Sequence, residues 1–424
     1  MQNHRILCAG ISILLCCLLL AGTALPASAE MMPPYLQSEA AILMDAETGQ
    51  ILFEKNSRER MYPASITKIM TGMLALTYLT PDQTITISQQ AYDAVPRTSS
   101  HIGLQPGEEV TVEQAMYALA MQSANDAANG LAEAVSGSQE EFARLMTETA
   151  HALGAADTQF TNANGLPDDG HYTTARDMAL ITAEALKTPG FCQYFSTINY
   201  HMLPTNLYPD IRSFVNPNQI LAGQYSYGGV LMSKTGWTSS AWGTLVTAVK
   251  QRDTTLIAVT LKSQYLEAKY QDTCALFDYG FTHFSKVALT GEELAAGVAA
   301  EGFVPVEGQE FSCLLPEGPK PSDLRFSLAE GTDLSSVHGQ TEVSVTAAAG
   351  DTALPEMRLL LRRSEEGAPL TAAAAAPVSG ESEPVEPEAA GIPWLPVVIA
   401  AVIVSLTICG FLILRKRALA VPAQ

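Results

Sequence analysis

The stretch Tyr62-Pro63-Ala64-Ser65-Ile66-Thr67-Lys68-Ile69-Met70-Thr71-Gly72 predicts a turn that leads into the first turn of a helix. Pro63 fixes φ at the entry, and the apolar residues after Ser65 recur at helical spacing. Ser65 and Lys68 are three residues apart, so they project from the same side of that helix. A serine hydroxyl needs a base to become a nucleophile, and a lysine of lowered pKa can be that base. The alternative is a helix cap beside a solvated lysine, because a chain of this length contains about one S-x-x-K by chance.

Two polar motifs follow downstream. Ser123-Ala124-Asn125-Asp126 lies between two predicted helices, near residues 111–120 and 127–135, where a hydroxyl and an amide can face a cleft. Lys234-Thr235-Gly236 closes a predicted strand, residues 230–234. Its lysine and threonine suit a carboxylate, and its glycine lets another backbone approach closely. Taken singly, a helix cap and an edge-strand lysine are the simpler interpretations. Together, S-x-x-K, S-x-N and K-T-G in this order form the active-site set of penicillin-binding proteins and serine β-lactamases.

Over about residues 36–285 the sequence resembles the low-molecular-mass D-alanyl-D-alanine carboxypeptidases more specifically. Beyond the three motifs, the resemblance is carried by Asp45-Ala46-Glu47-Thr48-Gly49, Phe160-Thr161-Asn162-Ala163-Asn164-Gly165-Leu166 and His171-Tyr172-Thr173-Thr174-Ala175-Arg176-Asp177. It implies an α/β (α+β), transpeptidase-like fold. In that fold, helices flank a five-stranded antiparallel sheet built from an N-terminal hairpin and the strands after residue 229.

The resemblance also implies a division of labour among the motif residues. Ser65 attacks the carbonyl between the two terminal D-alanines of a peptidoglycan stem peptide, and Lys68 takes its proton. Ser123 and Lys234 pass a proton to the leaving D-alanine, and β-lactams acylate the same serine. Backbone N–H groups of Ser65 and Trp237 form an oxyanion hole, and no cofactor or metal is required. The predicted catalytic residues are Ser65, Lys68 and Ser123, and the predicted substrate-binding residues are Asn125, Lys234, Thr235, Gly236, Trp237 and Thr238.

Two other functions compete with this hypothesis. A serine β-lactamase needs a deacylating carboxylate on a loop, and residues 160–172 contain Asp168 and Asp169 but no E-x-x-L-N pattern. A catalytically inactive wall-binding or sensory protein could keep the same scaffold, although the intact motifs argue against it. His171 lies in the same loop and is expected to structure it rather than to act as a base.

Both termini predict export and membrane anchoring. Arg5 precedes apolar residues 6–20, and Ala27-Ser28-Ala29 is a small-residue cleavage site, so residues 1–29 are predicted to be a signal peptide. Residues 394–414 form an uncharged apolar run long enough to span a bilayer, and Arg415-Lys416-Arg417 follows it. The positive-inside rule then places residues 415–424 in the cytoplasm and the catalytic part outside the cell membrane.

Composition completes the predicted organisation. A catalytic domain is expected at residues 30–285, a small β-rich module at 289–365, and a disordered acidic linker at 366–391. The formal net charge of −20 argues against nucleic acid as a partner. The resemblance implies stem peptides and β-lactams as partners, and the two terminal segments predict the membrane as a third.

Overall fold

The computed structural model describes residues 32–298, 300, 302–335, 337, 339–349 and 352–364. The predicted signal peptide, acidic linker, membrane span and cytoplasmic tail lie outside these residues. Among the residues described, no helix combines the length and apolar character needed to cross a membrane.

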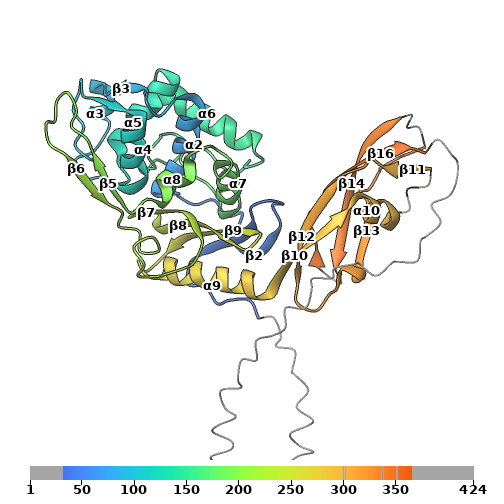
Figure 1. Ribbon diagram of the computed structural model, residues 1–424. Coiled ribbons are helices and arrows are strands. Elements are labelled where there is room, and N and C mark those ends of the chain that lie inside the picture. The colour runs from blue at the N-terminus through green and yellow to red at the C-terminus, as the bar shows by residue number, and fades with distance from the viewer. Residues whose placement is uncertain are drawn as a thin grey trace, which may run out of the picture. The chain divides into compact units, whose positions relative to one another are not determined.

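Five antiparallel strands form the central sheet in the order β2-β1-β9-β8-β7 (Figure 1). The predicted hairpin supplies β1 (Ala40–Asp45) and β2 (Ile51–Lys55), and the predicted meander supplies β7 (Val230–Thr238), β8 (Trp242–Gln251) and β9 (Thr254–Ser263). The predicted five-stranded antiparallel sheet is confirmed. One detail was wrong: β7 continues to Thr238, so the K-T-G motif lies inside the strand rather than at its end.

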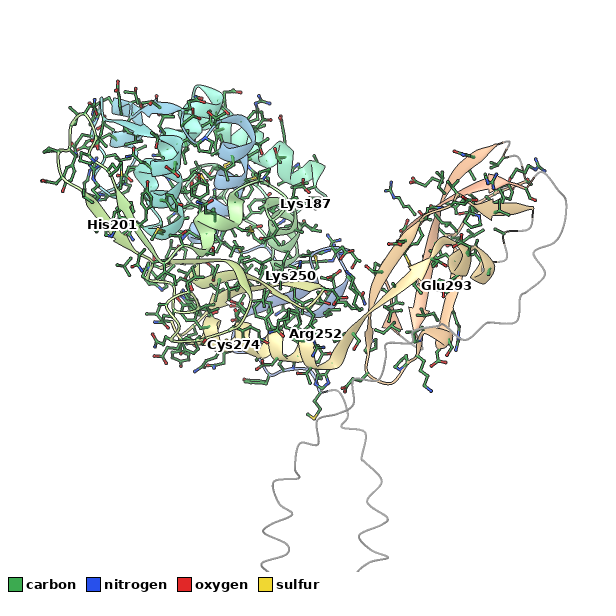
Figure 2. All side chains as sticks on the ribbon, viewed as in Figure 1. Lys187, His201, Lys250, Arg252, Cys274 and Glu293 are labelled. Carbon is green, nitrogen blue, oxygen red and sulfur yellow. The ribbon has the colours of Figure 1, made fainter. Side chains whose placement is uncertain are left out.

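Helices cover both faces of this sheet, which explains why β1 is buried throughout. Ile42 and Met44 pack into the larger core, whereas Ala41 and Leu43 pack into a second core with Leu276 of α9. This alternation follows from the two-residue period of a strand. Cys274 of α9 and Lys250 of β8, labelled in Figure 2, mark that helix and the sheet that it contacts. The helices are α2 (Lys68–Tyr78), α3 (Gln89–Asp93), α4 (Val112–Met121), α5 (Asn125–Ser136), α6 (Gln139–Ala152), α7 (Ala175–Ala185), α8 (Phe191–Ser196) and α9 (Ala268–His283).

The predicted break between two helices is present and has a local cause. A capping box formed by Thr111 and Gln114 starts α4, and the helix ends at Met121. Ser123 then takes a left-handed backbone conformation with φ of 54°, which no helix accommodates, and α5 starts at Asn125.

Residues 190–229 were predicted to be irregular, and this was partly wrong. They contain α8 and a hairpin of β5 (Asn199–Met202) and β6 (Arg212–Val215). Arg212 forms a buried ion pair of 2.8 Å with Glu108. Glu108 directly precedes β4 (Glu109–Thr111), which pairs with β3 (Thr84–Thr86). This long-range ion pair fixes the hairpin in place, and no local sequence pattern predicts it.

The residues after α9 are mainly strands. β10 (Phe284–Thr290) pairs with β12 (Glu310–Pro316), and a second sheet has the order β11-β16-β14-β13, with β15 (Thr352–Ala353) beside β14. The second sheet comprises β11 (Phe303–Pro305), β13 (Leu324–Leu328), β14 (Gln340–Ala349) and β16 (Met357–Arg363). α10 (Gly291–Gly297) and the short turn η2 (Pro321–Asp323) were not predicted. The proposed domain boundaries stay a prediction.

Candidate active site

Ser65 lies in η1 (Ala64–Thr67), a 3-10 turn that immediately precedes α2. It was predicted on the helix itself, but Ala64 has a left-handed φ of 52° and tightens the entry. β7 passes directly against this turn. A Cβ added to Gly236 would lie 2.8 Å from the Ser65 backbone nitrogen, so only glycine fits here without displacement. The close approach predicted for the K-T-G glycine is therefore an approach to the candidate nucleophile.

The amine of Lys68 is fully buried and has three oxygen neighbours. Its Nζ lies 3.2 Å from Ser65 Oγ, 2.7 Å from Asn125 Oδ1 and 2.5 Å from the Asn164 carbonyl oxygen. The amide and carbonyl oxygens are acceptors only, so each takes an N–H from the amine. An unprotonated amine has two N–H groups and one lone pair. With both N–H groups used in this way, the lone pair is left facing the Ser65 hydroxyl.

The electrostatics favour this unprotonated form. Burial, and then the charge of Lys234, hold the pKa of Lys68 well below its usual value, while Asp126 opposes the shift. The Asp126 carboxylate is itself occupied, because it accepts hydrogen bonds from the backbone N–H groups of Ile102 and Leu104. Lys68 is therefore a candidate general base for Ser65.

Ser123 and Lys234 form a second hydrogen-bonded pair at the site. Lys234 Nζ donates to Ser123 Oγ over 3.1 Å and to the Thr235 carbonyl oxygen over 2.9 Å. Burial, and then the charge of Lys269, lower the pKa of Lys234 to about 7. A proton can therefore leave or join this pair near neutral pH.

A cleft of about 300 Å³ connects these groups. Its lining includes Ser65, Ser123, Lys234, Thr235, Gly236 and Trp237, so the structure brings the predicted residues of all three motifs together. Trp237 leaves 59% of its surface exposed at the rim. Thr238 does not line the cleft, and its hydroxyl accepts from the backbone N–H of Ala241 instead. The structure therefore does not bring Thr238 to the predicted carboxylate site.

Comparison with known proteins agrees with this geometry. A family model described as D-alanyl-D-alanine carboxypeptidase (Peptidase_S11) matches residues 27–264. The chain belongs to this family.

Members of the carboxypeptidase family resemble the chain to different extents. It is 33% identical over 252 residues to the D-alanyl-D-alanine carboxypeptidase DacF of Bacillus subtilis, covering 58% of this chain but only 63% of that relative. It is 33% identical over 279 residues to the D-alanyl-D-alanine carboxypeptidase of Streptomyces sp. K15, covering 62% of this chain and 94% of the relative. The chain is 25% identical in sequence to the crystal structure of penicillin-binding protein 6B from Escherichia coli. The match has a TM-score of 0.61 and covers 79% of this chain and 98% of the crystallised chain.

One cation of the active site, Lys269, was not predicted from the sequence. Lys269, near the start of α9, is buried, and its Nζ donates to Thr235 Oγ1 and to the Gly236 carbonyl oxygen, the latter over 3.4 Å. Burial lowers the pKa of Lys269 to about 8. No local sequence pattern distinguishes this lysine from the other lysines of the chain.

Residues 160–172, here called the clamp loop, also contribute more than the sequence predicted. The Asn164 carbonyl holds Lys68, and the Ala163 carbonyl accepts from the Thr71 hydroxyl of α2 over 2.6 Å. Gly165 packs so tightly on η1 that an added Cβ would lie 1.9 Å from the Ala64 carbonyl oxygen. The clamp loop therefore closes the side of Lys68 that faces away from the cleft.

Proposed function

We propose that this chain is a serine-type D-Ala-D-Ala carboxypeptidase that removes the terminal D-alanine from peptidoglycan stem pentapeptides. The observation that carries the proposal is the placement of Lys68. Its buried amine lies 3.2 Å from the Ser65 hydroxyl, and its other two hydrogen-bond positions are occupied by Asn125 and Asn164.

In the acylation step, Ser65 Oγ attacks the carbonyl carbon of the penultimate D-alanine while its proton moves to Lys68 Nζ. The carbonyl oxygen becomes an oxyanion, for which the backbone N–H groups of Ser65 and Trp237 are the proposed donors. The C–N bond then breaks, and the departing amine takes a proton from Ser123, which is replenished by Lys234. The free D-alanine leaves, and an ester on Ser65 remains.

The substrate carboxylate is assigned to Thr235 and Lys269. Thr235 lines the cleft, and Lys269 Nζ donates a hydrogen bond to its hydroxyl. A cation and a hydroxyl together give the charge-assisted hydrogen bonds that a terminal carboxylate requires. This selects a peptide with a free C-terminus, as a carboxypeptidase must.

Hydrolysis of the ester completes the cycle. A water molecule adds to the acyl carbon and loses one proton to a neighbouring base, and Ser65 Oγ regains a proton as it leaves. A β-lactam would acylate the same serine, because its strained amide presents a carbonyl and a carboxylate in a similar arrangement. Penicillin binding is therefore part of the proposal.

The β-lactamase alternative lacks a suitable carboxylate. Asp168 and Asp169 of the clamp loop are exposed, and neither lines the cleft that contains Ser65. The inactive-scaffold alternative leaves the buried lysine pair unexplained, since burying two amines costs stability that a mere binding protein has no reason to lose. Both alternatives remain outcomes of the test below.

We also propose export and anchoring, for which residues 1–29 and 394–417 are the support. The catalytic part would lie outside the cell on a single membrane span, where peptidoglycan is made. Cleavage within residues 415–424 by added protease only in permeabilised cells would support this topology, and cleavage in intact cells would contradict it.

The function is tested by labelling purified protein with a fluorescent penicillin and by measuring D-alanine release from a stem pentapeptide. The wild type should do both, and Ser65→Ala should do neither while unfolding at a similar temperature. Rapid turnover of penicillin without D-alanine release would favour a β-lactamase, and the absence of labelling would favour an inactive scaffold.

A further inference from the structure

His171 is a buried titratable residue for which the proposed chemistry has no role. Only 1% of its surface is exposed, and the Phe160 ring that packs against it is 3% exposed. It belongs to the clamp loop, which delivers the Asn164 carbonyl to Lys68. The question is what this imidazole does so close to the candidate base.

The two ring nitrogens of His171 have different partners, and these fix the tautomer. The backbone N–H of Thr161 donates to Nδ1 over 3.1 Å, so Nδ1 carries the lone pair. Nε2 therefore carries the proton and donates to Thr67 Oγ1 over 2.9 Å. Burial lowers the pKa of His171 to about 4, so the ring is neutral at physiological pH.

The two bonds of His171 join two elements that matter for catalysis. Thr161 lies near the start of the clamp loop, while Thr67 ends η1, directly before Lys68. The Phe160 ring meets the imidazole edge at a centroid distance of 5.5 Å and fixes its plane. His171 is thus a rigid link between the loop and the turn that bears Ser65.

We infer that His171 is a positioning residue for the Lys68 amine: it fastens the clamp loop to η1, so that the Asn164 carbonyl accepts a hydrogen bond from one Lys68 N–H and the lone pair faces Ser65. The inference rests on the proposed function. It assigns to the neutral imidazole a structural bond to Thr67 rather than proton transfer, because neither ring nitrogen is left free to face the cleft.

Loss of this link has a specific electrostatic consequence. The charged groups that act on Lys68 are Lys234 and Asp126, and Asp168 and Lys68 act on His171. None of them is removed when His171 is replaced. Instead the clamp loop loosens, water reaches the rear of Lys68, and the desolvation that lowers its pKa decreases. The amine then becomes protonated at a higher pH.

The test compares the rate of acylation by a fluorescent penicillin from pH 5 to pH 10 in four single variants and one double variant of the full protein. His171→Phe keeps an aromatic ring beside Phe160 but removes both hydrogen bonds. His171→Gln can replace both bonds, since its amide accepts and donates. Thr67→Val removes only the hydroxyl that receives Nε2–H. His151→Phe is the matched control, because its Nε2 bonds the Thr158 carbonyl over 3.0 Å without contacting η1.

The ascending limb of the pH–rate profile should move to higher pH in His171→Phe and in Thr67→Val. Acylation at neutral pH should fall about tenfold for each unit by which the pKa of Lys68 rises. His171→Gln and His151→Phe should retain the wild-type limb. The double variant of His171→Phe with Thr67→Val should be no worse than the more affected single variant, because both remove the same bond.

An unchanged limb in a folded His171→Phe variant overturns the inference, as does a rate that falls equally at every pH, which indicates a structural role alone. If His171→Phe does not fold, the limb of Thr67→Val decides in the same way. A wild type that is not acylated at all contradicts the proposed function instead, so the two failures are distinguishable.

Discussion

Asn125 Oδ1 accepts a hydrogen bond of 2.7 Å from Lys68 Nζ, while Asn125 Nδ2 donates to Ser99 Oγ over 3.0 Å. The amide is thus held at both ends, with its oxygen toward the amine. Because it is uncharged, it orients Lys68 while stabilising the ammonium form less than a carboxylate would. Acylation by an unprotonated Lys68 depends on this neutrality.

Asn125→Asp should therefore impair acylation in a pH-dependent manner. The new carboxylate is nearly isosteric, but its negative charge stabilises the Lys68 ammonium and raises the pKa of Lys68. The ascending limb of acylation by fluorescent penicillin should move to higher pH, and the rate should recover in part at alkaline pH. Asn206→Asp, on the hairpin loop, makes the same charge change at an exposed site and should leave the limb in place. A limb that does not move in Asn125→Asp would show that Lys68 is not the titrating base.

We expect kcat/KM to decrease above about pH 8 as Lys269 loses its proton, because burial lowers the pKa of Lys269 to about 8. This decrease is the descending limb of the pH profile. Above that pH the free enzyme loses the cation proposed to hold the substrate carboxylate. Lys269→Arg keeps its charge to much higher pH and should shift this limb upward, whereas Lys269→Met should lower kcat/KM over the whole range.

The measurement for Lys269 is D-alanine release from a pentapeptide between pH 6 and pH 10. The limb should appear in kcat/KM more than in kcat, because a bound carboxylate stabilises the ammonium. Lys262→Arg, a partly exposed lysine at the end of β9, serves as the control. If Lys269→Arg leaves the limb unchanged, another group, such as Lys234, controls it.

The sequence predicted the three motifs and the sheet because these depend on local patterns. The apolar run that forms β1, the capping box at Thr111 and the glycine of K-T-G can each be recognised within a few residues. The motif side chains then meet because the fold is that of the family. This is why residues from Ser65 to Lys234 could be assigned to one cleft.

The sequence did not reveal groups whose importance depends on tertiary placement. Lys269 has no distinctive sequence context, and it becomes significant only because its amine reaches Thr235 of β7. The Asn164 contribution comes from a backbone carbonyl, which any residue type could supply. The β5–β6 hairpin depends on an ion pair between Glu108 and Arg212, which lie far apart in the chain. None of these has a local signature.

Gly236→Ala should lower the rate of acylation by about 100-fold while leaving the protein folded. The added Cβ would lie 2.5 Å from Thr244 Oγ1 and 2.8 Å from the Ser65 backbone nitrogen, so β7 and η1 must move apart. A displacement of about 1 Å at a reacting centre can cost about 100-fold in rate. Gly228→Ala, where an added Cβ meets nothing within 4 Å, is the control. Wild-type labelling by fluorescent penicillin in Gly236→Ala would exclude this contact as a determinant of activity.

Lys234→Met should stabilise the protein while eliminating its activity. The pKa of Lys234 is about 7 in the folded protein and near its ordinary value of 10.5 in the unfolded chain. Between these values the unfolded chain binds more protons, so burial of Lys234 destabilises the fold at neutral pH, and this cost decreases as pH rises. Each unit of difference corresponds to about 1.4 kcal/mol.

The gain in unfolding free energy for Lys234→Met should therefore be largest at or below about pH 7 and should shrink toward pH 10. Urea unfolding at several pH values measures it, with Lys250→Met as the control, because Lys250 is exposed on β8 (Figure 2). Equal gains at every pH would mean that improved packing, and not removal of a buried charge, stabilises the variant. A pH-dependent gain in unfolding free energy together with lost penicillin labelling would mean that Lys234 serves activity at the expense of stability. This is expected for a group whose lowered pKa serves proton transfer.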